Sequence, residues 1–170
     1  MKKTQYKNCF EGNEKWYVDK MKLINEKIET YDCRHMSNTK WRKLFLVILK
    51  NINIVKQCEI VEFVFDNCGI HWINDMKLTI NIDIIDEYLF EDYISERLAG
   101  GHNPISYREI NYIEFRKYYH KDVSRPSPPH NKYDTVNAEQ DLDEIKRIIS
   151  ATGKFYWEET EQYLRILGYS

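Results

Sequence analysis

Hydrophobic residues recur at helical spacing in two stretches of the first third of the chain. After a frayed start over residues 1–12, an apolar stripe runs from Asn13 to about Tyr31 with Lys and Glu on the outer face, which predicts an amphipathic helix. The stretch Trp41–Lys50 is apolar on almost all sides, and Ser37-Asn38-Thr39 can cap its first backbone N–H groups. Such a helix must be covered all round, so we expect it to be the central core element.

Past Asn53 the hydrophobic period changes from that of a helix to that of a strand. Residues 59–65 are rich in β-branched and aromatic side chains and are followed by strong turn residues. A short apolar run at 70–73 comes next, and residues 78–84 alternate strictly between apolar and polar. These three segments predict an antiparallel meander over residues 59–84.

A helix and a further strand follow the meander in the pattern. Asp86 can cap a helix with Leu89, Phe90, Tyr93, Ile94 and Leu98 inside, which Gly100-Gly101 would end. Residues 107–115 alternate over their second half and predict a fourth strand.

The last third is predicted to contain a loop, a helix and a pair of strands. Prolines within residues 121–137 favour extended backbone and indicate a loop. Asn137 can cap a helix that continues to Ser150, with acids early and bases late as the helix dipole favours. The tail, residues 155–169, could form a helix or a hairpin, and its alternation favours strands. The expected fold is therefore α+β, with an antiparallel sheet of about four to six strands packed against three to four helices.

Length and composition predict one cytoplasmic domain. The 170 residues suffice for one domain, and we expect residues 1–35 to be a helical extension of a single α+β domain at 36–170. No apolar run is long enough to span a membrane, and no signal peptide is visible. The four cysteines lack a Cys-x-x-Cys pair and are typical of reduced thiols. Abundant Ile, Asn, Lys and Tyr are typical of an AT-rich bacterial genome.

The small net charge of −2 hides an asymmetry along the chain. Residues 1–56 carry 13 basic against 6 acidic side chains, whereas residues 57–104 carry 2 against 10. The acidic block either folds against the basic N-terminal third and is neutralised there, or it attracts a partner of opposite charge. The even apolar stripe of the first helix indicates that this helix docks onto the domain or, as a homodimer through residues 14–31, onto a second copy.

Two arrangements of residues could hold a metal ion or perform catalysis. Cys68 and His71 have the spacing of half a zinc site, which Cys58 or the pair Cys33 and His35 could complete; the alternative is a turn cysteine beside a strand histidine. His102 follows two glycines, a setting that suits a general base and is also common for loop histidines. No Walker loop, GxGxxG, GxSxG or HExxH motif occurs, so we expect no cofactor.

The candidate partner-binding residues lie in the acidic block. Carboxylates interleaved with tyrosines form a docking surface for a basic partner, or else a solvated helix N-terminus. These residues are Asp83, Asp86, Glu87, Tyr88, Glu91, Asp92 and Tyr93. Basic residues alternate with aromatic ones at 40–43 and 116–121, but a pI near 6.2 and the lack of a nucleic-acid-binding motif argue against that function.

The stretch Met36-Ser-Asn-Thr-Lys-Trp-Arg-Lys-Leu-Phe45 resembles the opening of an uncharacterised bacterial family of small proteins, whose members begin near an Asn-Thr-Lys-Trp helix. The resemblance extends to Tyr107-Arg-Glu-Ile-Asn-Tyr-Ile-Glu114 and to the closing Leu164-Arg-Ile-Leu-Gly-Tyr169. It covers about residues 36–169 and implies a domain boundary at Met36, but no activity.

Two hypotheses of function follow. The first is a non-enzymatic cytoplasmic binding protein, such as an immunity-type protein that neutralises a basic toxin or another basic partner through its acidic surface. The second is an enzyme or metal-binding protein that uses His71, His102 and nearby acids or thiols. The lack of catalytic motifs favours the first.

Overall fold

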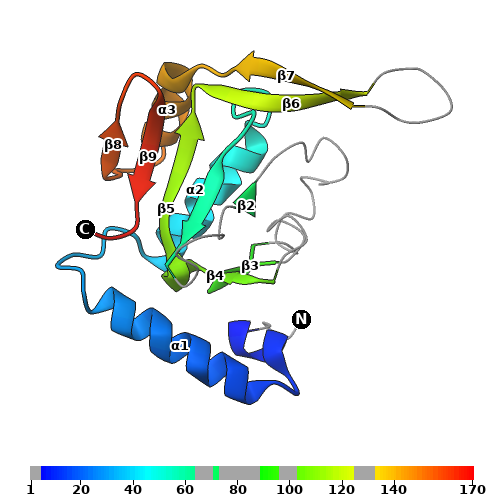
Figure 1. The fold of residues 1–170 in the computed structure, drawn as a ribbon. Helices are drawn as coiled ribbons and strands as arrows, with labels where there is room; N and C mark the ends of the chain where they lie inside the picture. The colour runs from blue at the N-terminus through cyan, green and yellow to red at the C-terminus, as the bar shows by residue number, and fades with distance from the viewer. Residues whose placement is uncertain (1–4, 64–70, 73–88, 96–102, 125–132) are drawn as a thin grey trace, which may run out of the picture.

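A five-stranded antiparallel sheet forms the centre of the molecule (Figure 1). The computed structural model describes residues 5–63, 71–72, 89–95, 103–124 and 133–170. The strands lie in the order β2-β1-β5-β9-β8 and every neighbouring pair is antiparallel. Their bounds are β1 Glu59–Glu62, β2 His71–Trp72, β5 Ile110–Arg116, β8 Trp157–Glu159 and β9 Tyr163–Leu167. The predicted α+β class is confirmed. The strand expected at 59–65 is confirmed over residues 59–62, the strand expected at 107–115 over residues 110–115, and the strands of the tail at 157–159 and 163–167, whereas residues 107–109 form a 3-10 helix.

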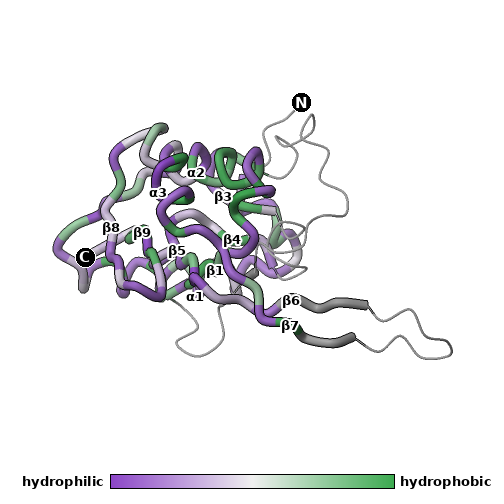
Figure 2. Tube along the Cα trace, turned by 90° about the horizontal axis from the view of Figure 1, so that it is seen from above, coloured by the Kyte–Doolittle hydropathy of each residue, from purple (hydrophilic) through white to green (hydrophobic). Residues whose placement is uncertain are grey.

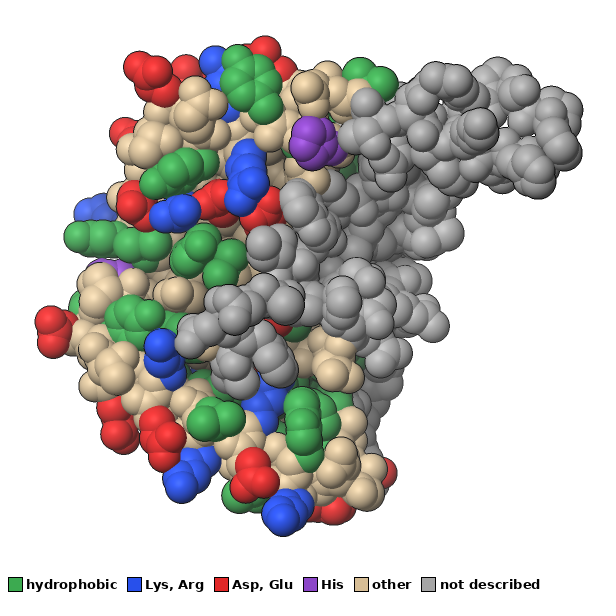
Figure 3. Space-filling model, in the orientation of Figure 1, with side chains coloured by type: hydrophobic (Ala, Val, Ile, Leu, Met, Phe, Trp, Pro, Cys, Tyr) green, Lys and Arg blue, Asp and Glu red, His purple; other side chains and the backbone are tan. Residues whose placement is uncertain are grey.

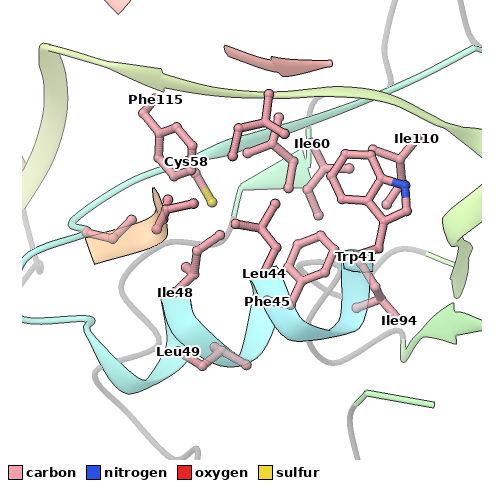
Figure 4. Packing of buried hydrophobic residues seen from close by; sticks show 14 of the residues in the cluster. Trp41, Leu44, Phe45, Ile48, Leu49, Cys58, Ile60, Ile94, Ile110 and Phe115 are labelled. Atoms are coloured by element: carbon pink, nitrogen blue, oxygen red, sulfur yellow. The ribbon is translucent and has the colours of Figure 1, made fainter. Parts of the chain in front are cut away.

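One face of this sheet is covered by α2 (Asn38–Lys50) and α3 (Leu142–Ser150), as the view from above shows (Figure 2). The Ser37 hydroxyl accepts a hydrogen bond from the Lys40 N–H at 3.2 Å and caps α2 as expected. Trp41, Leu44 and Ile48 point from α2 toward strand residues (Figure 4). Each fully buried large side chain contributes about 1.5–3 kcal/mol, so α2 is the core helix that its sequence predicts.

The N-terminal segment packs on the domain from its first described residues. Tyr6–Phe10 form the 3-10 helix η1, and α1 runs from Glu14 to Ile28. Tyr6 and Phe10 are buried in a small aromatic cluster, so the expectation of a frayed start is wrong for these residues. Lys20, expected on the outer face of the helix, is also buried, because its ammonium group forms an ion pair with the Glu109 carboxylate of the domain.

Strand pairing replaces the helix predicted after Asp86 wherever that stretch is described. β3 (Tyr93–Ile94) pairs with β4 (Ile105–Ser106). Leu89 and Ile94 form an antiparallel bridge across a turn, in which the Phe90 N–H donates to the Tyr93 carbonyl at 3.0 Å. The helical prediction is therefore wrong for residues 89–95. The two apolar pairs, at 89–90 and 93–94, lie four residues apart. This spacing fits a tight turn between strands as well as a helix, and tertiary packing selects between the two.

The predicted loop at 121–137 contains a two-stranded arm that projects from the body (Figure 1). β6 (Tyr118–Ser124) and β7 (Tyr133–Glu139) pair along their whole lengths, so the loop prediction is wrong for residues 121–124 and 133–137. Asn137 consequently lies in β7 and caps nothing. Asp141 caps α3 instead, accepting from the Glu144 N–H at 3.0 Å.

The strand predicted at 78–84, which is the third member of the meander, lies outside the described residues. The short 3-10 helix η4 (Tyr107–Glu109) precedes β5. Among the described residues no helix has the length and apolar character needed to cross a membrane.

Candidate functional site

The structure describes only part of the acidic block that the sequence singles out. Of the predicted site residues, Asp83, Asp86, Glu87, Tyr88, Cys68 and His102 lie outside the described residues. His71 lies in β2, in register with Ile60 of β1. Glu91 is exposed, Asp92 is half-buried and Tyr93 is buried.

Asp92 and Tyr93 contact the chain's own N-terminal segment. The Tyr6 N–H donates to Asp92 Oδ2 at 3.1 Å, and the Tyr6 ring lies 5.7 Å from that of Tyr93. Tyr93 also stacks on Phe90 with ring centroids 4.4 Å apart. At these two positions the acidic block therefore packs against the N-terminal third, which is one of the two arrangements that the charge pattern allows.

A buried polar triad joins the N-terminal segment to the domain beside Asp92. Lys20 Nζ lies 2.7 Å from Glu109 Oε2, and the Tyr6 hydroxyl donates to Glu109 Oε1 at 2.9 Å. Lys20 also donates to the Tyr6 hydroxyl at 2.9 Å. Burial raises the pKa of Glu109 to about 7, against the lowering effect of Lys20. The sequence offers no local signal for the triad, because its members come from distant parts of the chain.

An open acidic groove of about 880 Å³ lies between the N-terminus of α3 and the turn that joins β8 to β9. Two lysines in the groove form ion pairs, Lys117 with Glu139 at 3.4 Å and Lys146 with Glu159. In the described part of the chain, Asp143 and Glu161 form no ion pair. The five carboxylates that line the groove are Glu139, Asp141, Asp143, Glu159 and Glu161.

Charged residues alternate across the sheet face opposite α2 and α3, where they form a visible band (Figure 3). Glu59, Glu114 and Arg165 are directly paired on three adjacent strands, and Glu158 of β8 pairs with Arg165. Both Glu114 oxygens accept from guanidinium groups, Oε1 from Arg116 at 2.7 Å and Oε2 from Arg165 at 2.6 Å. We call these five residues the charged ladder.

The charged ladder borders a second hollow of about 350 Å³, which shares Gln162 with the acidic groove. Burial raises the pKa of Glu59, and Arg116 at 3.3 Å opposes that effect. A carboxyl group with a raised pKa suits a general acid, but ion pairs that join neighbouring strands are also a common structural device. Because each Glu114 oxygen already accepts from a guanidinium group, one of them on the neighbouring strand, the ladder fits the structural role better.

The thiols and histidines of the described chain do not converge. Cys9, Cys33 and Cys58 are reduced, and Cys58 belongs to the hydrophobic core. Cys33 Sγ lies 3.8 Å from His35 Nδ1, and the His35 ring stacks on Tyr156 at 4.2 Å. Among the described residues no three His, Cys, Asp or Glu side chains are grouped as a metal site would require.

The stretches in which basic and aromatic residues alternate are used for folding. Trp41 is fully buried in the core, so its ring cannot stack on a base. Arg116 and Lys117 are engaged by Glu114 and Glu139, respectively.

Comparison of the chain with protein-family models, with curated proteins and with solved structures found no match. The resemblance to a bacterial family that opens with an Asn-Thr-Lys-Trp helix therefore stays a prediction.

Proposed function

We propose that the protein is a non-enzymatic binding protein that engages a basic partner through an acidic surface, as an immunity-type protein would when it neutralises a basic toxin. The acidic groove is the observation that carries the proposal: five carboxylates line it against two lysines. A cytoplasmic location and a bacterial origin belong to the same proposal and rest on the sequence.

The groove has the physical properties that recognition of a basic surface requires. Its carboxylates are largely exposed, so they can steer an approaching cation without a large cost of burial. Their backbone is held in place, because Asp141 caps α3 and β8 pairs with β9 along the other wall. A rigid acidic wall loses little conformational entropy when a partner binds.

The experiment is capture of a partner from the native host with the tagged full-length chain. We expect a basic protein whose binding weakens as salt is raised from about 0.05 to 0.5 M, because salt screens charges on this scale. Asp143→Lys/Glu161→Lys should reduce affinity at least about tenfold, since like charges then face each other. The control, Asp19→Lys/Glu29→Lys, makes the same charge change at an exposed position of α1 and at the exposed residue that caps its C-terminus.

The capture supports the proposal only if the groove variant loses binding and the α1 control retains it. Binding that resists both salt and the groove variant would contradict the proposal. Asp86→Lys/Glu91→Lys tests the acidic block in the same assay. If this variant loses binding and the groove variant does not, the partner binds the acidic block and not the groove.

The alternative function, an enzyme or metal-binding protein that uses His71, His102 and nearby acids or thiols, stays a prediction. Elemental analysis of the purified, folded protein is the direct test. Stoichiometric zinc would support the metal-binding form, and a folded protein without metal would exclude it.

A further inference from the structure

We propose that residues 6–28 act as an intramolecular ligand of an acidic, aromatic site on the domain, and that this site binds a basic partner segment carrying a lysine and a tyrosine when residues 6–28 leave it. The domain side of this site, which we call the latch site, consists of Phe90, Asp92, Tyr93 and Glu109. The latch site is separate from the acidic groove, and the proposal does not depend on the groove.

The domain positions the acceptor of the latch site without help from the N-terminal segment. Glu109 belongs to a capping box in which its side chain accepts from the Ser106 N–H while the Ser106 hydroxyl accepts from the helix backbone. Glu109 also ends a 3-10 helix that leads directly into β5. The carboxylate is therefore held in one geometry by residues close to it in sequence, as a preformed binding site requires.

The bound segment shows which chemistry the latch site accepts. It places an ammonium group 2.7 Å from one Glu109 oxygen and a phenol hydroxyl 2.9 Å from the other. The Lys20 ammonium also lies over the Trp16 ring at 5.2 Å, and the Tyr6 and Tyr93 rings are in contact. A partner segment that fits must therefore offer a lysine beside an aromatic phenol and bury both.

The segment contacts the domain through the triad with Glu109, the aromatic cluster and a hydrogen bond from the Arg108 guanidinium to Asn25 Oδ1 at 2.8 Å. Tyr6 and Phe10 pack in a cluster separate from the main core, whose described members begin at Met36. After the segment, Cys33 and Ser170 exchange two backbone hydrogen bonds that hold the chain on the domain. Removal of one partner of a buried ion pair leaves an uncompensated charge, so removal of the lysine should release the segment, because release returns the Glu109 carboxylate to water.

The test uses a fluorescent peptide of residues 5–29 added to the full-length chain. Peptide binding to the Lys20→Met chain should be at least about tenfold tighter than to wild type, because the variant segment no longer occupies the site. Lys22→Met is the matched control, since Lys22 is 74% exposed on the same helix, and it should bind as weakly as wild type. A peptide carrying Lys20→Met should not bind the vacated site.

Hydrogen exchange on the same chains distinguishes release of the segment from unfolding of the domain. In Lys20→Met, exchange should rise over residues 14–28 while β5 and β9 stay protected. If β5 and β9 also lose protection, the segment is an integral part of the core and the proposal is overturned. Equal peptide binding to wild type and Lys20→Met, or none to either, overturns it as well.

Discussion

The side-chain amide of Gln140 pairs with the backbone of Gln57 through two hydrogen bonds. Its Oε1 accepts from the Gln57 N–H at 3.2 Å, and its Nε2 donates to the Gln57 carbonyl at 2.9 Å. The same amide accepts from the Lys56 N–H at 3.0 Å and donates to the Arg116 carbonyl at 2.7 Å. One buried side chain thus joins the entry of β1, the end of β5 and the start of α3, and it holds one wall of the acidic groove in place.

Gln140→Leu should lower the free energy of unfolding by about 2–4 kcal/mol, because the buried backbone groups it serves would lose their partners. Urea unfolding monitored by circular dichroism measures this change. Gln162→Leu, at an exposed position of the same groove, should change stability by less than about 0.5 kcal/mol. Equal effects of the two substitutions would contradict the stabilising role of the Gln140 hydrogen bonds.

The cost of Lys20→Met should depend on pH. The pKa of Glu109 rises on folding from 4.5 to about 7, so this carboxyl contributes stability that is fully present below about pH 4.5 and is lost as pH rises through about 7. At pH 8 the variant deprives the Glu109 carboxylate of its cation, which costs up to about 3–5 kcal/mol, because the carboxylate must either stay buried and unpaired or lose the contacts of the released segment. At pH 5 the carboxyl group can take up a proton, and the cost should be smaller.

Chemical denaturation of wild type and Lys20→Met at both pH values measures this difference. Glu109→Gln serves as the control, because a glutamine cannot titrate and should show no such pH dependence at this site. A penalty for Lys20→Met that stays the same or grows from pH 8 to pH 5 would refute the direction of the Glu109 pKa shift.

Gly168→Ala should destabilise the chain by about 2 kcal/mol or more. A Cβ at this position would lie 2.6 Å from the Ile110 carbonyl oxygen and 3.1 Å from a ring carbon of Trp41. Backbone cannot move aside as the end of a flexible side chain can, so the strain should fall on the pairing of β5 with β9. Gly153→Ala is the control, because its new methyl group would meet only Phe155 at an ordinary distance of 3.8 Å. Thermal unfolding distinguishes the two.

Deletion of residues 1–35 should leave a folded domain of lower solubility. The main hydrophobic core begins at Met36, whereas the deletion uncovers Tyr93 and the carboxylate of Glu109. Far-ultraviolet circular dichroism and a cooperative unfolding transition test for the fold. A product without a cooperative unfolding transition would show that the N-terminal helix is part of the core and would contradict the predicted boundary.

The local hydrophobic pattern correctly predicted the elements whose buried face is set by residues close together in the sequence. The core helix with its Ser37 cap, the strand from Glu59, the strand ending at Arg116 and the tail hairpin all follow from periodicity and capping chemistry. Their apolar faces are continuous, so any compact fold must bury them in much the same way.

The same patterns predicted the wrong element where spacing alone fits two local structures. The apolar pairs at 89–90 and 93–94 fit a helix, but Leu89 forms an antiparallel bridge with Ile94, and Ile94 pairs with Ile105 between β3 and β4. The arm formed by β6 and β7 exists because two polar strands pair with each other, which a single strand's composition does not reveal. Because Asn137 lies in β7, the next residue whose side chain is suited to capping, Asp141, becomes the cap of α3.

Hydrophobic periodicity specifies which face of an element is buried, and it therefore fixes the class of the fold and its central helix. The polar contacts depend instead on tertiary packing: Lys20 with Glu109, the pairs of the charged ladder, and the carboxylates brought together in the groove. A charged side chain can lie in solvent or in a buried pair at similar free energy. Which of these it does depends on the group that the rest of the fold places opposite it.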